Sequence, residues 1–336
     1  MNIVNFAVPG YQPLNRTALA SHQTQMYDLR TEANVWVVKI NYLPDLFDRF
    51  NRLTMDMGES SRQLRESALT LEYELVDSFR RLTKTEKELE QEADPDETKE
   101  LEEYLTNVLD QARSVVTDRA NRIGRCLANV NDPFDLSLTH TYIADFECEE
   151  RNATLEIQLL QEKLAGVSEE RQVIIEAIAT LQKNGIEELG KDIELNIGKV
   201  TELGLAPPEI KLVMLALEQL KKTLIDAGNA IHFLDLVRGS DKLRAKIEEL
   251  TASINVEKSI IIASQGKVAF LNTIHAMEGE RQGYADIYRI GVSAFDQFLA
   301  ATAPTQFADG ASRRNAFKEQ TRLFISFLKP LSMPPR

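Results

Sequence analysis

The sequence has little glycine and little proline, and this scarcity predicts long helices. Its 336 residues include 15 glycines and 11 prolines. Because most prolines lie near the two ends or at a few turns, long stretches can remain helical without interruption. Cysteine is nearly absent as well. Cys126 and Cys148 are too few for a disulfide framework and lack the paired spacing of a metal site, so we expect free thiols.

Three other absences exclude broad classes of protein. No window holds about 18 consecutive uncharged apolar residues, so an ordinary transmembrane helix is not predicted, although a segment that inserts only after assembly would escape this test. Residues 1–10 lack a basic region followed by an apolar run, so we expect no secretory signal peptide and synthesis in the cytosol. The net charge of -13 disfavours a nucleic-acid partner.

Signatures of catalysis are missing too. The sequence contains no phosphate-binding glycine loop, no dinucleotide-binding glycine pattern and no nucleophile elbow. Four histidines occur: His22, His140, His232 and His275. None has a second histidine or cysteine at the spacing of helical metal ligands. We therefore predict no catalytic residue, no cofactor and no metal, and an active site formed across helices is the third alternative for function.

A seven-residue apolar repeat marks the region from Arg62 to Gln91. One series comprises Ala68, Leu75, Leu82 and Leu89. A second series with the same seven-residue spacing is interleaved with it and comprises Leu64, Leu71 and Ser78. This repeat predicts a coiled-coil helix. It ends before Asp94, which can cap a second helix, while Glu97 stands at the capping-box position. We therefore expect a helical hairpin whose second arm runs from Glu97 to about Val130.

The remaining pattern predicts an all-α fold: an elongated bundle of long antiparallel helices with a helical tail and a small helical head at the far end of a coiled-coil pair. Outside the hairpin, helices are predicted over 14–29, 33–59 with a kink or break at Pro44, 144–184, 241–280, 284–301 and 313–328. The corresponding domains are 1–143 and 282–336 (tail), 144–185 and 241–281 (stalk helices) and 186–240 (head hairpin).

The head carries an amphipathic pattern from Pro208 to Val237, where apolar and polar side chains fall on opposite arcs of a helix. The candidate membrane- or partner-contact face comprises Leu212, Val213, Leu217, Leu220, Leu224, Ile231, Leu234 and Val237. The candidate polar face, which would line a water-filled lumen, comprises Glu218, Lys222, Asp226 and Asn229. In water we expect the apolar face to pack on residues 186–205, where the partner stripe comprises Leu189, Ile193, Ile197 and Val200. The other possibility adds a second state, in which this face meets lipid or a partner.

With a helical tail, a long antiparallel pair and an intervening head, the sequence resembles the α-helical pore-forming toxins of the cytolysin A superfamily. Within it, the chain is similar to the B component of the binary xenorhabdolysin type (XaxAB- and YaxAB-like). The resemblance extends over nearly the whole chain as a pattern, without a short diagnostic motif. It implies a non-enzymatic cytotoxin or hemolysin subunit that is released from the bacterium. Such a subunit assembles with a larger A component into a hetero-oligomeric, ring-shaped pore in the host cell membrane.

The head departs from the charge-free tongue of some single-component relatives. Five charged residues interrupt it: Glu218, Lys221, Lys222, Asp226 and Asp235. We therefore expect membrane contact to depend on the A component. Replacing Leu220 and Leu224 with Asp is expected to abolish lysis and to leave the soluble fold intact. The main alternative is a coiled-coil scaffold or interaction protein whose tip docks a protein partner and never meets lipid.

Overall fold

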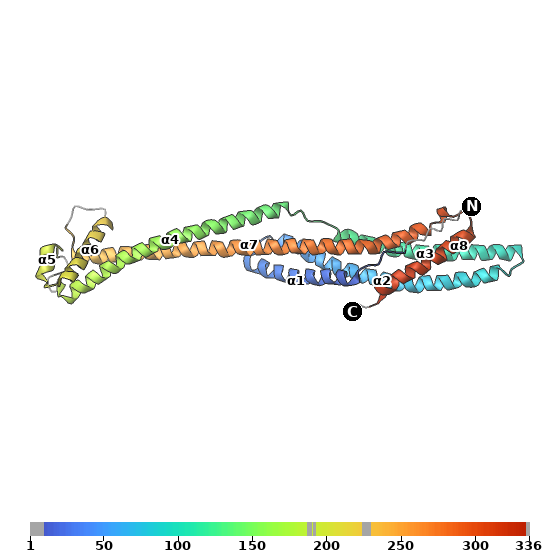
Figure 1. Ribbon diagram of the computed structural model, residues 1–336, viewed down its shortest axis with the longest axis horizontal. Coiled ribbons are helices and arrows are strands. Elements are labelled where there is room, and N and C mark those ends of the chain that lie inside the picture. Colours follow the sequence, from blue (N-terminus) through green and yellow to red (C-terminus); the bar gives the residue numbers. More distant parts are fainter. Residues whose placement is uncertain (1–9, 187–189, 191–192, 224–229, 334–336) are drawn as a thin grey trace. The chain divides into compact units, whose positions relative to one another are not determined.

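The computed structural model describes residues 10–186, 190, 193–223 and 230–333. Its elements are α1 (Arg16–Ile40), α2 (Pro44–Leu89), α3 (Pro95–Val130), α4 (Ser137–Lys183), α5 (Ile197–Glu202), α6 (Pro207–Thr223), α7 (Phe233–Ala301), the short 3-10 helix η2 (Pro304–Gln306) and α8 (Gly310–Ser332) (Figure 1). Within the described ranges, extended pairing is limited to one isolated bridge between Glu194 and His232. The all-α prediction is confirmed. The chain forms two compact units: residues 1–140 with 269–336 (unit 1), and residues 141–268 (unit 2).

Unit 1 is a helical bundle built on the predicted heptad residues. In it, α2 packs against α1, α3 and α8. Ala68, Leu75 and Leu82 are fully buried, as the seven-residue repeat predicts. Large aromatic side chains complete the core: Phe50, Phe270, Phe295, Phe298, Phe317 and Phe324. Each fully buried apolar side chain contributes about 1.5–3 kcal/mol to the hydrophobic term, which is the main force that holds such a bundle together.

The α2–α3 hairpin is confirmed, but its cap differs from the prediction. The Asp94 carboxylate accepts the backbone N–H of Asp96 at 2.8 Å, so Asp94 caps α3 as expected. The reciprocal bond is not made by Glu97. Instead, the Asp94 N–H donates to Oε1 of Glu92 at 2.9 Å. A residue of the turn therefore takes the role that the capping-box pattern assigns to the third residue of the helix.

The predicted break at Pro44 within the helical region 33–59 is confirmed. α1 continues to Ile40, and α2 begins at Pro44 and runs without a break to Leu89. Proline restricts the residue before it and suits the first turn of a helix, so the break lies just before Pro44 and Pro44 starts α2. The connection turns sharply, with positive φ angles of 47° at Asn41 and 46° at Leu43.

Unit 2 contains the predicted antiparallel pair, formed by α4 and the first part of α7. Leu160 of α4 packs with Leu250 and Ile254 of α7. Nearer the start of α4, Ser264 Oγ donates to the carboxylate of Glu149 at 2.6 Å, so the two helices run in opposite directions. α4 begins at Ser137, seven residues before the predicted start, because Asp135 accepts the Ser137 N–H at 2.9 Å.

The predicted break between helices over 241–280 and 284–301 is wrong. α7 is one helix of 69 residues, from Phe233 to Ala301. Gly283 lies within the expected break, but its role is to let the side chain of His22 on α1 pack closely against α7. A Cβ at position 283 would lie 2.6 Å from Cε1 of His22. The glycine is therefore explained by packing, although glycine inside a helix is usually unfavourable by about 1 kcal/mol relative to alanine.

Candidate functional site in the head

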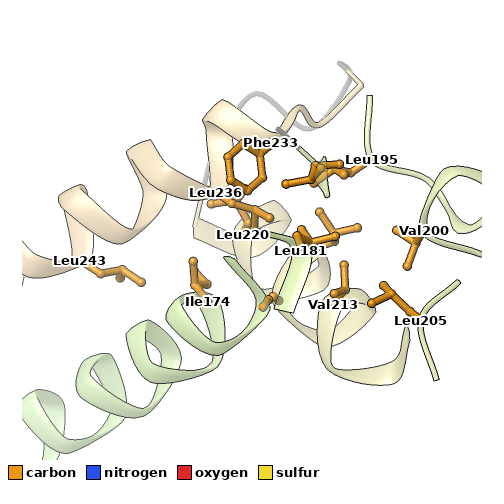
Figure 2. Packing of buried hydrophobic residues seen from close by; sticks show 14 residues of the cluster. Ile174, Leu181, Leu195, Val200, Leu205, Val213, Leu220, Phe233, Leu236 and Leu243 are labelled. Atoms are coloured by element: carbon orange, nitrogen blue, oxygen red, sulfur yellow. The ribbon is translucent and has the colours of Figure 1, made fainter. Parts of the chain in front are cut away.

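The head of unit 2 is organised around a cluster of buried apolar side chains, which we call the head core. It draws on the end of α4, the segment before α5, α5 itself, α6 and the start of α7, and Figure 2 shows these side chains pointing toward one another. Its buried members are Ile174, Ala177, Leu181, Ile186, Leu195, Val200, Leu205, Val213, Ala216, Leu217, Leu220, Phe233, Leu236 and Leu243. Segments far apart in the sequence thus share one small core.

The head core takes in much of the predicted apolar face. Val213, Leu217 and Leu220 are 0–4% exposed, and Ile231 and Val237 are partly buried and pack against the head core. Two further members of that face, Leu212 and Leu234, are half-buried. Leu224 lies outside the described residues. The expectation that this face packs inward is therefore confirmed for the described core members.

The polar face is described only in part. Glu218 and Lys222 are exposed and form an ion pair with an N–O distance of 3.2 Å. Asp226 and Asn229 lie outside the described residues. A single helix from Pro208 to Val237 is not what the structure contains, since α6 ends at Thr223 and a new helix, α7, begins at Phe233. Leu234 and Val237 therefore belong to a different helix from Leu217 and Leu220.

The predicted partner stripe is correct at two positions and wrong at one. Val200 is fully buried, and Ile193 is half-buried against the head core. Ile197 is 62% exposed and points away from that core. Leu189 lies outside the described residues. The stripe fails at Ile197 because α5 is only six residues long, so a periodicity extrapolated over 186–205 does not apply to it.

Two backbone hydrogen bonds join the segment before α5 to the start of α7. The N–H of Leu195 donates to the carbonyl of Ile231 at 2.7 Å, and the N–H of Phe233 donates to the carbonyl of Ile193 at 3.2 Å. Glu194 and His232 stand opposite each other between these bonds. We call this arrangement the head latch. Sequence reasoning missed it because a one-residue bridge has no alternating pattern.

A groove of about 910 Å³ lies on the surface of the head. Its lining includes apolar side chains and basic side chains: Ile197, Ile210, Met214, Leu215, Lys211 and Lys221. Leu215 is 46% exposed and, with Ile197, leaves apolar surface open to solvent. Glu194 and Glu218 line the groove as well, so its charged lining is mixed in sign.

The described part of the chain offers little for metal or thiol chemistry. Within it there is no group of three or more His, Cys, Asp or Glu residues placed to hold a metal ion. Cys126 and Cys148 are free thiols, as predicted, and burial raises the pKa of the Cys126 thiol. A search of the described helices for a stretch both long and apolar enough to cross a bilayer finds none.

In unit 1, the structure pairs two histidines that lie far apart in the sequence. The ring centroids of His140 and His275 are 4.5 Å apart. Thr139 Oγ1 donates to the carbonyl of Leu136 at 2.9 Å and forms a hydrogen bond of 2.7 Å with Nε2 of His275. Burial lowers the pKa of His275, and the nearby His140 lowers it further. Protonation of His275 is therefore disfavoured in the folded state.

This pair predicts that acid weakens unit 1. Since the folded pKa of His275 lies below its unfolded value, the unfolded chain binds more protons as the pH falls through about 6.5. The contribution of neutral, buried His275 to the stability of unit 1 is complete above that pH. It declines as the pH falls from there to the pKa of His275 in the folded state. We expect the thermal midpoint of the wild type, followed by the fluorescence of Trp36, to fall more between pH 8 and pH 5 than that of His275→Gln. Parallel pH curves for the two proteins would contradict the assignment.

The helices and the head core define an all-α fold shared with components of pore complexes. XaxB from Xenorhabdus nematophila superimposes with a TM-score of 0.80 at 15% identity, covering 96% of this chain and 98% of that one. PaxB from Photorhabdus luminescens gives 0.70 at 16% identity, covering 96% and 97%. A chain of the XaxAB pore complex from Xenorhabdus nematophila gives 0.61 at 15% identity, covering 96% and 98%. No family model and no curated relative matches the sequence.

Proposed function

We propose that this chain is a non-enzymatic subunit of a pore-forming toxin, a B-type component that assembles with a larger A component into a ring in a target membrane. The observation that carries the proposal is the fold shared with XaxB over 96% of this chain at a TM-score of 0.80. The likeness to a chain of the XaxAB pore complex supports a two-component assembly. The pattern of the head supports the same proposal independently.

The head core supplies the apolar surface that such a pore needs. Val213, Leu217 and Leu220 are shielded from water in the closed head. Exposing each side chain to water would cost about 1.5–3 kcal/mol, whereas exposing it to lipid would cost little. The head therefore stays closed in solution and opens where lipid or the A component covers these side chains. In the open state Glu218 and Lys222 face a water-filled lumen, because a charged side chain is expensive in hydrocarbon.

The exposed apolar residues of the head groove are the first part of the closed head to meet lipid in this proposal. In the mixture with the A component, we expect Ile197→Asp/Leu215→Asp to reduce dye release from liposomes at least about tenfold, since two carboxylates at a lipid surface oppose apolar insertion. Both side chains are largely exposed, at 62% and 46%, so the closed head should remain folded. Circular dichroism and the thermal midpoint check the fold.

Val256→Asp provides the matched control, because Val256 is 58% exposed on α7 and lies in unit 2 outside the head. It should leave dye release within about twofold of the wild type, as surface substitutions usually have small effects. If the head variant and Val256→Asp release dye equally well, the head groove has no role in membrane contact.

The substitution Leu220→Asp cannot serve as a fold-neutral test. Leu220 is 0% exposed, and a Cβ at Gly239 would lie 2.3 Å from its Cδ1, so the two positions are in tight contact. A carboxylate in this core would destabilise the closed head itself. The burial of Leu220 therefore argues against the expectation that replacing Leu220 and Leu224 with Asp leaves the soluble fold intact, and both this and the effect on lysis stay predictions.

The decisive experiment for the proposed function is dye release from liposomes and lysis of red cells by the purified chain, alone and mixed with the product of the neighbouring gene. Lysis only in the mixture supports a two-component pore. A stable particle in solution that leaves membranes intact under both conditions would overturn the proposal in favour of a scaffold.

A further inference from the structure

One face of α2 in unit 1 carries a row of exposed apolar side chains. Leu69, Tyr73 and Val76 are 47%, 74% and 41% exposed and follow one another at spacings of four and three residues, so they share a face of the helix. Single exposed apolar residues are ordinary, but a contiguous patch marks an interaction site. Here the side chains adjoin one another along a single helix.

Two grooves border this row within unit 1. One, of about 480 Å³, is lined by apolar side chains of three helices that include Leu19, Leu64, Leu69 and Leu331. The other, of about 360 Å³, lies along α2 itself and is lined by Leu69, Tyr73 and Val76 together with the charged residues Glu72, Asp77 and Arg80. Leu69 belongs to both. The row therefore offers concave apolar surface on either side of Leu69, which suits the side chains of a second helix.

Arginines stand at both ends of the row. Arg65 and Arg80 are exposed, and neither forms an ion pair with any described residue. Two carboxylates beside the row form ion pairs: Glu66 with Arg62 at 3.7 Å, and Asp77 with Arg81 at 2.9 Å. A third, Glu72, accepts a hydrogen bond from the hydroxyl of Ser332 at 2.8 Å and keeps its negative charge near the middle of the row. The row therefore presents at each end an arginine without an ion-pair partner among the described residues, about 22 Å apart at 1.5 Å rise per residue.

This placement of charge disfavours a second copy of the same row as the occupant. Tyr73 lies near the midpoint between Arg65 and Arg80, so pairing two rows either parallel or antiparallel sets arginine opposite arginine. Like charges juxtaposed across an interface are costly, which makes self-pairing through this face unfavourable. The complementary surface must instead carry carboxylates at both ends.

We propose that the row formed by Arg65, Leu69, Tyr73, Val76 and Arg80 docks an acidic amphipathic helix of a different protein. That helix presents an aliphatic stripe to Tyr73 and its neighbours and one carboxylate to each arginine. The inference rests on the proposed function for the identity of that protein, which is the A component of the same pore. It assigns partner recognition to α2 of unit 1 and leaves membrane contact to the head of unit 2.

The test uses two synthetic helical peptides of about 22 residues, long enough to span both arginines. One carries a leucine stripe with glutamates at both ends, and the other has lysines in place of those glutamates. Binding to the full-length chain is measured by fluorescence anisotropy at low salt. We expect the acidic peptide to bind about tenfold more tightly than the basic one, because two exposed charge pairs change from attraction to repulsion. Arg65→Glu/Arg80→Glu should reverse this preference.

The apolar contribution is tested separately. Tyr73→Asp should weaken binding of the acidic peptide by at least about tenfold, as expected for a central aromatic contact. Tyr104→Asp is the matched control, since Tyr104 is 44% exposed on α3 of the same unit. It should bind the acidic peptide as the wild type does. The fluorescence of Trp36 during unfolding checks that each variant is folded.

The inference is overturned if neither peptide binds, if both bind equally, or if the Tyr73 and Tyr104 variants behave alike. Dye release by the wild-type mixture is measured independently. Leakage without a peptide preference overturns this inference and leaves the proposed function standing. A peptide preference without leakage overturns the proposed function and leaves the row on α2 as a docking surface for an acidic helix.

Discussion

A disulfide between positions 194 and 232 is expected to abolish pore formation, and its reduction to restore it. Glu194 and His232 stand opposite each other in the head latch, flanked by the two backbone hydrogen bonds rather than joined by them. In such a pair the Cα atoms are about 4.5 Å apart, which lies within the range that a disulfide spans. Glu194→Cys/His232→Cys can therefore form the bond without moving the backbone.

The expected effect is large because the latch ties together two parts of the head that the proposed opening separates. In the wild type, this connection consists of two backbone hydrogen bonds, each with a net worth of about 1 kcal/mol. These can exchange for other partners during insertion. A covalent bond cannot, so Leu195 and Phe233 would remain together in the head core.

Dye release is measured for the oxidised and the reduced double variant in a background where Cys126 and Cys148 are replaced by serine, so that no other disulfide forms. We expect the oxidised protein to lose at least about 90% of its activity, as a covalent lock should, and the reduced protein to regain it. The single variants Glu194→Cys and His232→Cys control for the loss of each side chain. Oxidised protein that lyses as fast as reduced protein would show that the latch need not open.

Replacing Arg281 with methionine is expected to cause the largest loss of stability in unit 1. The Arg281 guanidinium is 3% exposed and holds the Glu278 carboxylate through two hydrogen bonds of 2.8 and 2.7 Å. It also donates to the carbonyl of Val130, the last residue of α3, at 3.0 Å. Removing the arginine leaves a buried carboxylate and a buried carbonyl without this partner. Breaking one side of a buried pair typically costs about 3–5 kcal/mol.

The free energy of unfolding is measured by urea denaturation followed at Trp36, the single tryptophan of the chain, which lies in α1 of unit 1. Arg289→Met is the matched control. Arg289 pairs with Asp286 at the same three-residue spacing on the same helix, but both side chains are about half exposed. An exposed pair contributes about 0–1 kcal/mol. Equal losses for the two variants would mean that burial of the Arg281 pair is unimportant.

The double variant Glu278→Gln/Arg281→Met separates the two contributions to this loss. It removes the Glu278 carboxylate, which Arg281→Met leaves buried without its cationic partner, so it should recover much of the free energy of unfolding. Replacement of a buried ion pair by neutral side chains is often close to neutral. A double variant as unstable as Arg281→Met would assign the loss to the missing bond with the Val130 carbonyl instead.

The fold was predictable where periodicity extends over many turns. The seven-residue series through Ala68, Leu75 and Leu82 indicated a buried seam in α2, and all three side chains are fully buried. The hairpin at Asp94 was predictable because its cap is a local interaction between residues two positions apart. Helix ends were predictable at Pro44, where a break was expected and α2 begins, but not at Gly283, which resembled a break and instead gives space to His22 inside α7.

The buried residues of the candidate site were predictable from the sequence, but the division of the site between two helices was not. The amphipathic pattern correctly marked Val213, Leu217 and Leu220 as one apolar face. It could not indicate that the helix ends at Thr223, because apolar residues continue at a helical spacing into α7. The pairing of His140 with His275 was equally hidden, since 135 residues separate the two in the chain.

By itself, the sequence determined the helical class of this protein, the α2–α3 hairpin and the antiparallel pair of unit 2, because hydrophobic periodicity and helix caps act through residues near one another in the chain. Only the tertiary structure decided how the head is closed, which arginines on α2 lack an ion-pair partner among the described residues, and which histidines meet. Those properties depend on groups from distant segments that come within a few ångströms after folding, and one-dimensional patterns do not encode such distances.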